Sequence, residues 1–221
     1  MDVAKEIQRL GGKFGANLRA PGQPILRIVL KNSQANDQTL AMFRDLRHLQ
    51  VLDLEKTRIT NAGLASLGGL IELQQLSLRQ DAIGDAGLEQ LKGLRKMVVL
   101  DLTGTNTTDL GLPHLKGMTK LEALSLGGTQ ITDVGAALTG LNLLQRLDVG
   151  STRITDRGVA KIVRLNNLQS LDLDHTDVTD AAIDDLISAS GLVSLRLDGT
   201  KITDAGVAKL KAALPKLEVI R

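Results

Sequence analysis

The chain has 221 residues, 43% of them hydrophobic, and its 27 lysines and arginines nearly balance 25 aspartates and glutamates, giving a net charge of +2. That charge is too small for a partner such as duplex DNA or an anionic membrane, and two phenylalanines as the only aromatic residues exclude base-stacking platforms for single-stranded nucleic acid. The absence of cysteine excludes disulfides, thiolate catalysis and cysteine-ligated zinc.

The N-terminal segment is expected to be a cap. Residues 2–10 carry apolar side chains at helical spacing, and the glycine pair at 11–12 ends the pattern. We therefore predict that residues 1–21 cover the exposed end of the repeats that follow. The segment contains charged residues where a signal peptide has an apolar run, and the chain has no stretch of about 18 apolar residues, so no leader and no membrane span are expected. If Met1 is the natural start, the protein is expected to be cytoplasmic.

Residues 22–221 repeat with a period of 24 residues, as eight blocks followed by a terminal strand. Each block contains L-x-x-L-x-L, whose last two leucines point to one face of a short strand. Thr-x-Ile-Thr-Asp follows, and its second threonine is predicted to cap a short helix, with the aspartate at the positive end of the helix dipole. The predicted caps are Thr60, Thr108, Thr132, Thr155, Thr179 and Thr203. One block is a residue short and one a residue long, both at the helix end, so the strand register is expected to be unaffected.

A single block cannot bury its own leucines, so the blocks must stack with neighbouring strands parallel. The quoted residues resemble the leucine-rich repeat family, close to its cysteine-containing subtype, and the T-x-I-T-D-A-G-L wording is similar to bacterial members. The resemblance implies an α/β fold: a right-handed solenoid, or horseshoe, with a parallel β-sheet on its concave face and short helices on its convex face. Where the family often has asparagine or cysteine after the strand, bonded along the stack, this chain has mostly threonine, and we expect a hydroxyl ladder there. The residues at this position are Thr57, Asp81, Thr105, Thr129, Thr152, Thr176 and Thr200.

The outward residues of the strands form the candidate binding site, because solenoids bind through the concave sheet and its rims. They predict an N-terminal third of mixed charge that supplies long basic side chains, a middle with mostly glycine, and an acidic C-terminal third. The glycines either leave a trough for a partner, flanked by opposite charges that orient it, or merely suit the turn after each strand. The trough glycines are Gly104, Gly127, Gly128 and Gly150. The candidate partner-binding residues are Arg27, Lys31, Asp53, Glu55, Arg79, Asp101, Asp148, Asp172, Asp174, His175, Arg196 and Asp198.

These features indicate a non-catalytic module that binds an unidentified protein or peptide on its concave face, without cofactor or metal. A cation site around Asp172 and Asp174 is disfavoured because Arg196 is expected beside Asp172. A Ser151, His175 and Asp174 set lacks a nucleophile elbow and an oxyanion donor, so catalysis is not expected. Two alternatives stay open. One is a small-ligand, glycan or cation-dependent binder at the acidic third, and the other is a scaffold that self-associates through the uncapped C-terminal edge.

Overall fold

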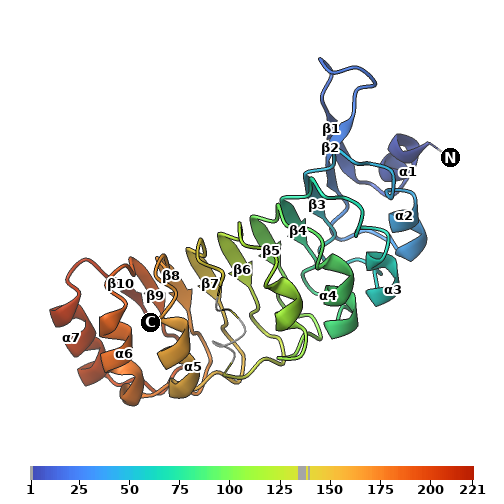
Figure 1. The fold of residues 1–221 in the computed structure, drawn as a ribbon. Coiled ribbons are helices and arrows are strands. Elements are labelled where there is room, and N and C mark those ends of the chain that lie inside the picture. The colour runs from blue at the N-terminus through green and yellow to red at the C-terminus, as the bar shows by residue number, and fades with distance from the viewer. Residues whose placement is uncertain (1, 134–137, 139) are drawn as a thin grey trace.

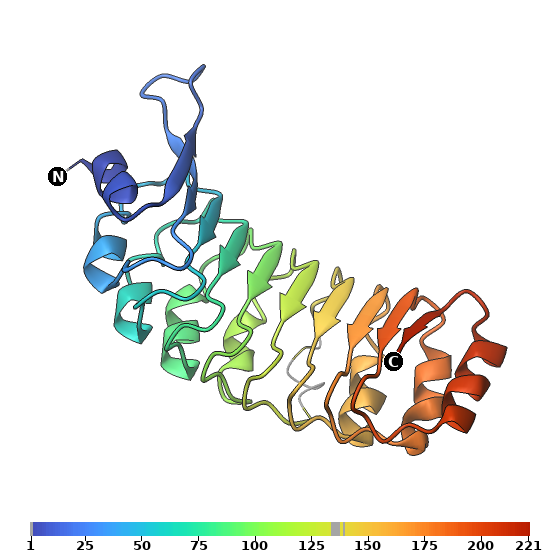
Figure 2. The ribbon, with the colours of Figure 1, turned by 180° about the vertical axis from the view of Figure 1, so that it is seen from behind.

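A computed structural model describes residues 2–133, 138 and 140–221. One ten-stranded sheet runs along the molecule with its strands in sequence order, and short helices line the opposite side (Figures 1 and 2). The architecture is the expected α/β leucine-rich repeat solenoid, with the sheet on the concave face and the helices on the convex face. It differs from the expectation at the first strand. β1 (Lys13–Ala16) pairs antiparallel with β2 (Ile25–Val29), whereas all later strand pairs are parallel.

The strands that follow β2 are three residues long, and their central residue points into the molecule. They are β3 (Val51–Asp53), β4 (Gln75–Ser77), β5 (Val99–Asp101), β6 (Ala123–Ser125), β7 (Arg146–Asp148), β8 (Ser170–Asp172), β9 (Ser194–Arg196) and β10 (Glu218–Ile220). Paired central residues are 24 positions apart, as in Leu100 and Leu124, except that Leu124 pairs with Leu147. The short block therefore leaves the strand register intact, as predicted. For the long block the prediction is wrong, because Leu195 pairs with Val219 instead of Ile220, which is exposed.

The helices are short, and a threonine caps several of them. They are α1 (Val3–Arg9), α2 (Asp37–Ala41), α3 (Asn61–Leu64), α4 (Asp85–Leu91), α5 (Asp156–Ile162), α6 (Ile183–Ser188) and α7 (Asp204–Ala213), with 3-10 turns η1 (Leu112–Leu115) and η2 (Asp180–Ala182). The predicted caps at Thr60, Thr155, Thr179 and Thr203 are confirmed, because each hydroxyl accepts a backbone N–H of the following turn.

The prediction that Thr108 begins a helix in the same way is only partly confirmed. Its hydroxyl accepts the N–H of Leu110 at 3.2 Å, yet only the 3-10 turn η1 follows. Pro113 explains the difference, because it has no N–H to donate inside a helix and its ring collides with the preceding turn. The helix expected after Thr132 falls on residues outside the described part of the chain.

Six aspartates at the Asp position of the repeat have a second role that the sequence analysis missed, whereas Asp204 at the same position contacts Arg221. In α5, Asp156 accepts the backbone N–H of Thr179 at one carboxylate oxygen and the Thr179 hydroxyl at the other, both at 2.8 Å. Each of the six aspartates thus ties its own coil to a threonine of the next coil. We call this set the Asp–Thr ladder. Its other pairs are Asp37–Thr60, Asp85–Thr108, Asp109–Thr132, Asp133–Thr155 and Asp180–Thr203.

The predicted hydroxyl ladder after the strands is wrong in most coils. The Thr105 hydroxyl donates to the Leu102 carbonyl, three residues earlier in its own coil, at 2.7 Å. Thr129, Thr152, Thr176 and Thr200 do the same. The short threonine side chain reaches this local carbonyl, so it does not bridge to the next coil. The exception is Asp81, whose Oδ1 accepts both the N–H and the hydroxyl of Thr57, at 2.7 and 3.0 Å.

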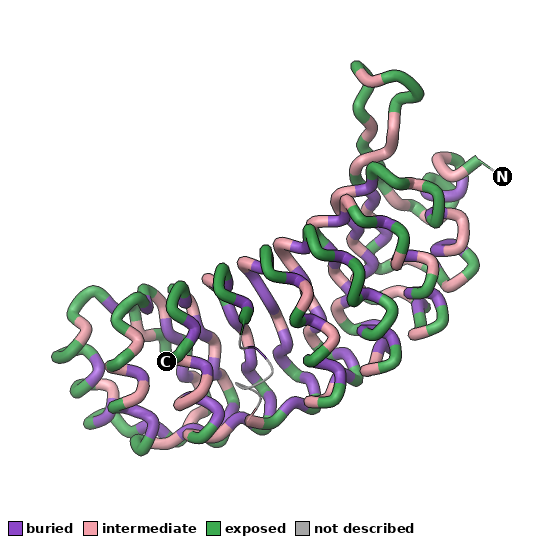
Figure 3. The backbone as a smooth tube through the Cα atoms, in the orientation of Figure 1, coloured by how far each residue is buried: buried purple, intermediate pink, exposed green. Residues whose placement is uncertain are grey.

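The core is one continuous column of buried leucine and isoleucine between the sheet and the helices (Figure 3). Ile7 of α1 is completely buried in it, and the capping role of the N-terminal segment stays a prediction. A side chain at Gly12 would place its Cβ 2.6 Å from Leu30 and 2.8 Å from the Val29 carbonyl, so glycine lets the N-terminal segment lie close against β2. The boundary at residue 21 stays a prediction. No described helix is both long and apolar enough to cross a membrane.

Candidate functional site

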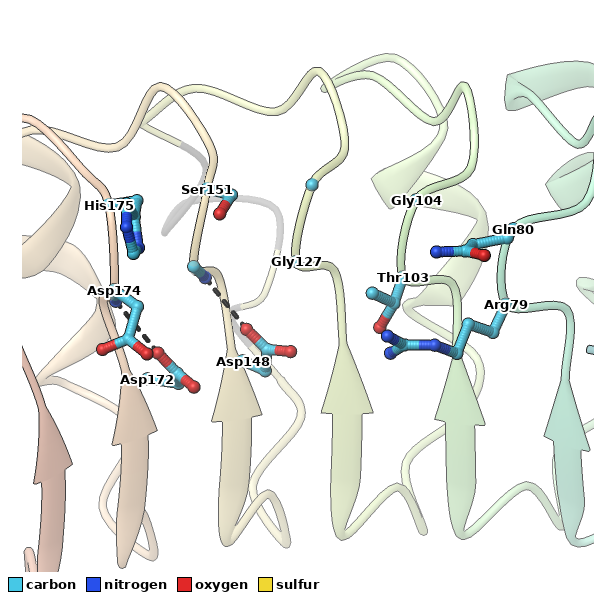
Figure 4. A pocket seen from close by; sticks show the side chains of 12 residues that line it. Arg79, Gln80, Thr103, Gly104, Gly127, Asp148, Ser151, Asp172, Asp174 and His175 are labelled. Carbon is cyan, nitrogen blue, oxygen red and sulfur yellow. Dashed lines mark hydrogen bonds between the residues drawn. The ribbon is translucent and has the colours of Figure 1, made fainter. Parts of the chain in front are cut away.

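Two hollows on the concave face gather most of the predicted binding residues. The N-terminal pocket, of about 420 Å³, is lined by Lys13, Phe14, Gly15, Arg27, Val29, Lys31 and Asp53. The central groove, of about 320 Å³, is lined by Arg79, Gln80, Thr103, Gly104, Gly127, Gly128, Asp148, Gly150, Ser151, Asp172, Asp174 and His175 (Figure 4). Two smaller hollows, of about 210 and 230 Å³, lie over β2–β5 and β6–β9.

These hollows place the predicted residues in three groups. Arg27, Lys31 and Asp53 surround the N-terminal pocket, whereas Arg79, Asp148, Asp172, Asp174 and His175 surround the central groove. Asp101 and Arg196 line the smaller hollows. Two residues lie outside all four hollows. Glu55 lies 3.9 Å from Lys56 and 3.8 Å from Arg79, and Asp198 lies beside Arg196.

The glycines of the groove have two different structural roles. Each strand from β2 to β9 is followed directly by a buried residue such as Leu78 or Leu102. The residue two positions later adopts a left-handed conformation whatever its identity, as Gln80 does with φ of 58° and Gly104 with φ of 69°. Gly104 and Gly128 therefore relieve the strain of that turn. Gly127 does something else, because a Cβ there would lie 2.8 Å from an oxygen of Asp148. The expected trough is thus partly filled by the Asp148 carboxylate.

Carboxylates held by backbone N–H groups form the acidic side of the groove (Figure 4). Asp148 accepts the N–H of Gly150 and Asp172 accepts that of Asp174, both at 2.9 Å. Burial raises the pKa of Asp148, and the charges of Asp172 and Asp101 raise it further, against the lowering effects of the Gly150 N–H and Arg79. Asp148 is therefore a carboxylate whose charge the surrounding protein only partly compensates.

Arg196 neutralises the far end of the acidic third. Its guanidinium lies 2.8 Å from Asp174, 3.6 Å from Asp172 and 4.0 Å from Asp198. Burial and the neighbouring Asp172 raise the pKa of Asp174, while Arg196 lowers it. The expected contact between Arg196 and Asp172 is confirmed. Asp101 and Asp148, in contrast, form no ion pair within the described residues.

Lys13 is a site residue that the sequence analysis missed. The antiparallel pairing of β1 with β2 places it opposite Val29, at the wall of the N-terminal pocket. Among the described residues, Lys13, Arg27 and Lys31 have no ion-pair partner. The segment KFGA is too short, and contains a glycine, so it carries no readable strand alternation. The available signal was a basic residue directly before Phe14, one of the two phenylalanines in the chain.

The chemical alternatives find little support in the geometry. Within the part of the chain that the structure describes, no hydrogen bond joins the side chains of Ser151, His175 and Asp174. The same described residues contain no group of three or more histidine, aspartate or glutamate side chains arranged to hold a metal ion. The groove presents charged and polar side chains, among them Arg79, Asp148 and His175.

Comparisons with known proteins agree with the fold. A family model described as leucine-rich repeat matches residues 95–154, and another with the same description matches residues 45–68 and 164–186. Internalin C2 from Listeria monocytogenes is 26% identical with a TM-score of 0.70, over 89% of this chain and 80% of that chain. The leucine-rich repeat ectodomain of the Arabidopsis thaliana receptor kinase GASSHO1/SCHENGEN3, solved in complex with CASPARIAN STRIP INTEGRITY FACTOR 2, is 18% identical with a TM-score of 0.61 and shows the fold alone, over 89% of this chain and 27% of that chain.

No curated protein matches the sequence significantly. The cysteine-containing subtype and the bacterial origin therefore stay predictions. The repeat pattern, the solenoid of stacked coils and the matches of both family descriptions agree with one another. The chain is a leucine-rich repeat protein, and both its family and its internalin-like fold are those of protein-interaction modules in general.

Proposed function

We propose that this protein binds another protein, or a peptide segment, on its concave face. The observation that carries the proposal is the run of four hollows along that face, which begins at β1 and extends to β9. Concave surfaces of solenoids serve as extended binding surfaces because many coils each contribute a few residues to them. The residues proposed to contact the partner are those predicted from the sequence, with Lys13 added.

The central groove supplies groups that a polypeptide can satisfy. Gln80 and His175 line it, and both are exposed side chains that carry hydrogen-bonding groups. A peptide backbone offers both donors and acceptors to such groups. The neighbouring glycines allow a backbone to approach closely on the Gly104 side.

The alternative functions rest on weaker ground. A cation-dependent or glycan binder in the acidic third would need Asp172 and Asp174 free, but Arg196 contacts both. Self-association through the edge of β10 stays a prediction, and light scattering over a range of concentrations tests it. We propose no catalytic role.

A steric block on the concave face tests the proposal. Ser125 points outward from β6, between Asp101 and Asp148 in the strand register, and a Ser125→Trp variant fills the space above it without changing charge. Gln90→Trp on the exposed side of α4, which also leaves the charge unchanged, is the matched control. Random twelve-residue peptides displayed on phage are selected on the wild-type protein, and each enriched peptide is then measured against both variants. Binding lost with Ser125→Trp and kept with Gln90→Trp is expected. Enriched peptides that tolerate Ser125→Trp, or no enrichment at all, would contradict a concave binding face.

A further inference from the structure

The concave face is electrically divided along its length. On the outward positions of β2–β4 and the two solvent-facing turn residues after each strand, with Lys13 of β1 added, five basic residues stand against two acidic ones. They are Lys13, Arg27, Lys31, Lys56 and Arg79 against Asp53 and Glu55. On β5–β9 the proportion is reversed. Asp101, Asp148, Asp172, Asp174 and Asp198 stand against Arg146 and Arg196.

Internal ion pairs leave some charges without a partner in both the basic and the acidic half of the concave face. In the N-terminal half, Glu55 is close to Lys56 and Arg79, so Lys13, Arg27 and Lys31 are the cations without an ion pair in the described structure. These three surround the N-terminal pocket, where Asp53 is the one acidic lining residue. A partner's carboxylates would therefore find unengaged cations there, beside the apolar Val29.

In the C-terminal half the free charges lie nearer the middle of the molecule than the sequence suggests. Arg196 contacts three carboxylates at the far end. Asp148 has no such contact, and it lies between Asp101 and Asp172 with a groove open beside it. Asp148 borders both the central groove and the hollow over β6–β9, so a cation from either side can reach it.

The distance between the two charged sites fits a short extended segment. The N-terminal pocket lies on β2 and the Asp148 site on β7, five strand steps apart in the sheet order. At about 4.8 Å per step the span is roughly 24 Å, and an extended chain at about 3.3 Å per residue covers it with roughly seven residues. The two smaller hollows lie along this path and contain apolar Val51, Val99 and Ala123.

We infer that the partner is an extended polypeptide segment of divided charge, with its carboxylates over the N-terminal pocket and a lysine or arginine side chain against Asp148. The inference rests on the proposed function and narrows the class of partner. Both charged sites act together, because opposite charges at the two ends set which way the segment lies and reject a segment of uniform charge. Between its charged ends, the segment carries small or apolar side chains that face the path over β3–β6.

The peptides selected on the wild-type protein test the inference. The expected result is enrichment of sequences with acidic residues toward one end and basic residues toward the other, separated by several uncharged positions. Synthetic copies should bind about tenfold more weakly to Asp148→Asn and to Lys13→Gln/Lys31→Gln. Asparagine at 148 keeps an acceptor for the Gly150 N–H, so this variant removes charge and leaves the turn in place. Glu89→Gln on α4 and Lys120→Gln, both exposed, are the matched controls and should bind like the wild type.

The outcomes separate the inference from the proposed function. Peptides that Ser125→Trp excludes, but that are uniformly charged or indifferent to Asp148→Asn and Lys13→Gln/Lys31→Gln, would overturn the divided-charge segment and leave the concave binding face standing. Peptides that bind Ser125→Trp normally would overturn both. Loss of binding in the charge variants should also be mimicked by raising the salt concentration, because exposed charges are screened over about 10 Å at 0.1 M ionic strength.

Discussion

At the centre of β6, Leu124 is a buried leucine like the central residue of each neighbouring strand, whereas the next position, Ser125 in β6, holds different residues in different coils. The inward position is leucine from β3 to β9 and is almost completely buried. The outward position reads Asp53, Ser77, Asp101, Ser125, Asp148, Asp172 and Arg196. The inward side chain has one environment, a packed core, and the outward side chain faces solvent. The repeated inward leucines therefore build the solenoid, and the outward residues, which differ from coil to coil, are available for recognition.

The largest expected difference lies between these two adjacent residues. Leu124→Ala should lower the free energy of unfolding by about 2–5 kcal/mol, because it removes apolar contacts and leaves a cavity. Ser125→Ala should change it by about 0.5 kcal/mol or less. Urea denaturation followed by circular dichroism measures both. Similar losses in the two variants would mean that the outward row is as structural as the core.

The second comparison is between aspartates within the Asp–Thr ladder and outside it. Asp156→Ala removes two hydrogen bonds to Thr179 and a favourable charge at the start of α5, and should cost about 1–3 kcal/mol. Asp177→Ala removes only an exposed ion pair with Lys201, for which about 0–1 kcal/mol is expected. The same denaturation experiment compares the free energies of unfolding of the two variants. Equal losses would show that the Asp–Thr ladder does not contribute to joining the coils.

Asp81 stands where most other coils have threonine, and this buried carboxyl group should make the stability of the protein depend on pH. Burial raises the pKa of Asp81 to about 6 from an ordinary 3.8, with Asp53 and Glu55 adding to the rise and the two Thr57 bonds opposing it. Its second oxygen is buried and has no hydrogen-bond partner among the described residues. Between these pKa values the folded state holds more protons than the unfolded state, so stability should fall as pH rises from about 4 to about 6.

Asp81→Asn should remove that part of the pH dependence. The amide keeps an oxygen for Thr57 and carries no charge, so the variant should be more stable than the wild type at pH 7 by about 1–2 kcal/mol. Denaturation midpoints from pH 4 to 8 measure the effect. A variant that is less stable at pH 7, or that keeps the wild-type pH profile, would show that the buried carboxylate is accommodated in its charged form.

The smallest expected effect on stability belongs to Asp148→Asn. The substitution preserves the bond from Gly150 and relieves repulsion from Asp172 and Asp101, so the free energy of unfolding should stay within about 0.5 kcal/mol of the wild type or rise slightly. The same variant is expected to lose peptide affinity. A large loss of stability would make Asp148 part of the scaffold and would weaken its assignment to recognition.

The repeat period alone predicts most of the fold, because strands 24 residues apart must stack whatever their outward residues are. The capping threonines follow from local chemistry, and η1 departs from it only where Pro113 intervenes. The Asp–Thr ladder could not be read in the same way, because Asp156 and Thr179 become neighbours only once the coils are stacked. For the same reason the sequence places a glycine trough where the structure has the Asp148 carboxylate beside Gly127.

The sequence predicted which residues face the candidate site, but only part of how they are arranged there. Arg27, Lys31 and Asp148 occupy outward positions as expected, because alternation along a strand fixes the face. Lys13 reaches the pocket because β1 pairs antiparallel with β2. The repeat pattern does not predict this pairing, because β1 precedes the first repeat. Which charges are free also depends on side-chain contacts, and Arg196 engages the carboxylates that look most acidic in the sequence.

The most direct test of the central account is the position of a bound segment on the concave face. A selected peptide carries a spin label at its acidic end, and amide signals of the isotope-labelled protein are recorded with the label oxidised and reduced. Broadening that is strongest at β2, β3 and the N-terminal pocket and declines toward β7 and β8 is the expected result. Broadening that is strongest at β7 and β8, or on the helices of the convex side, would contradict a concave face whose divided charge orients its partner.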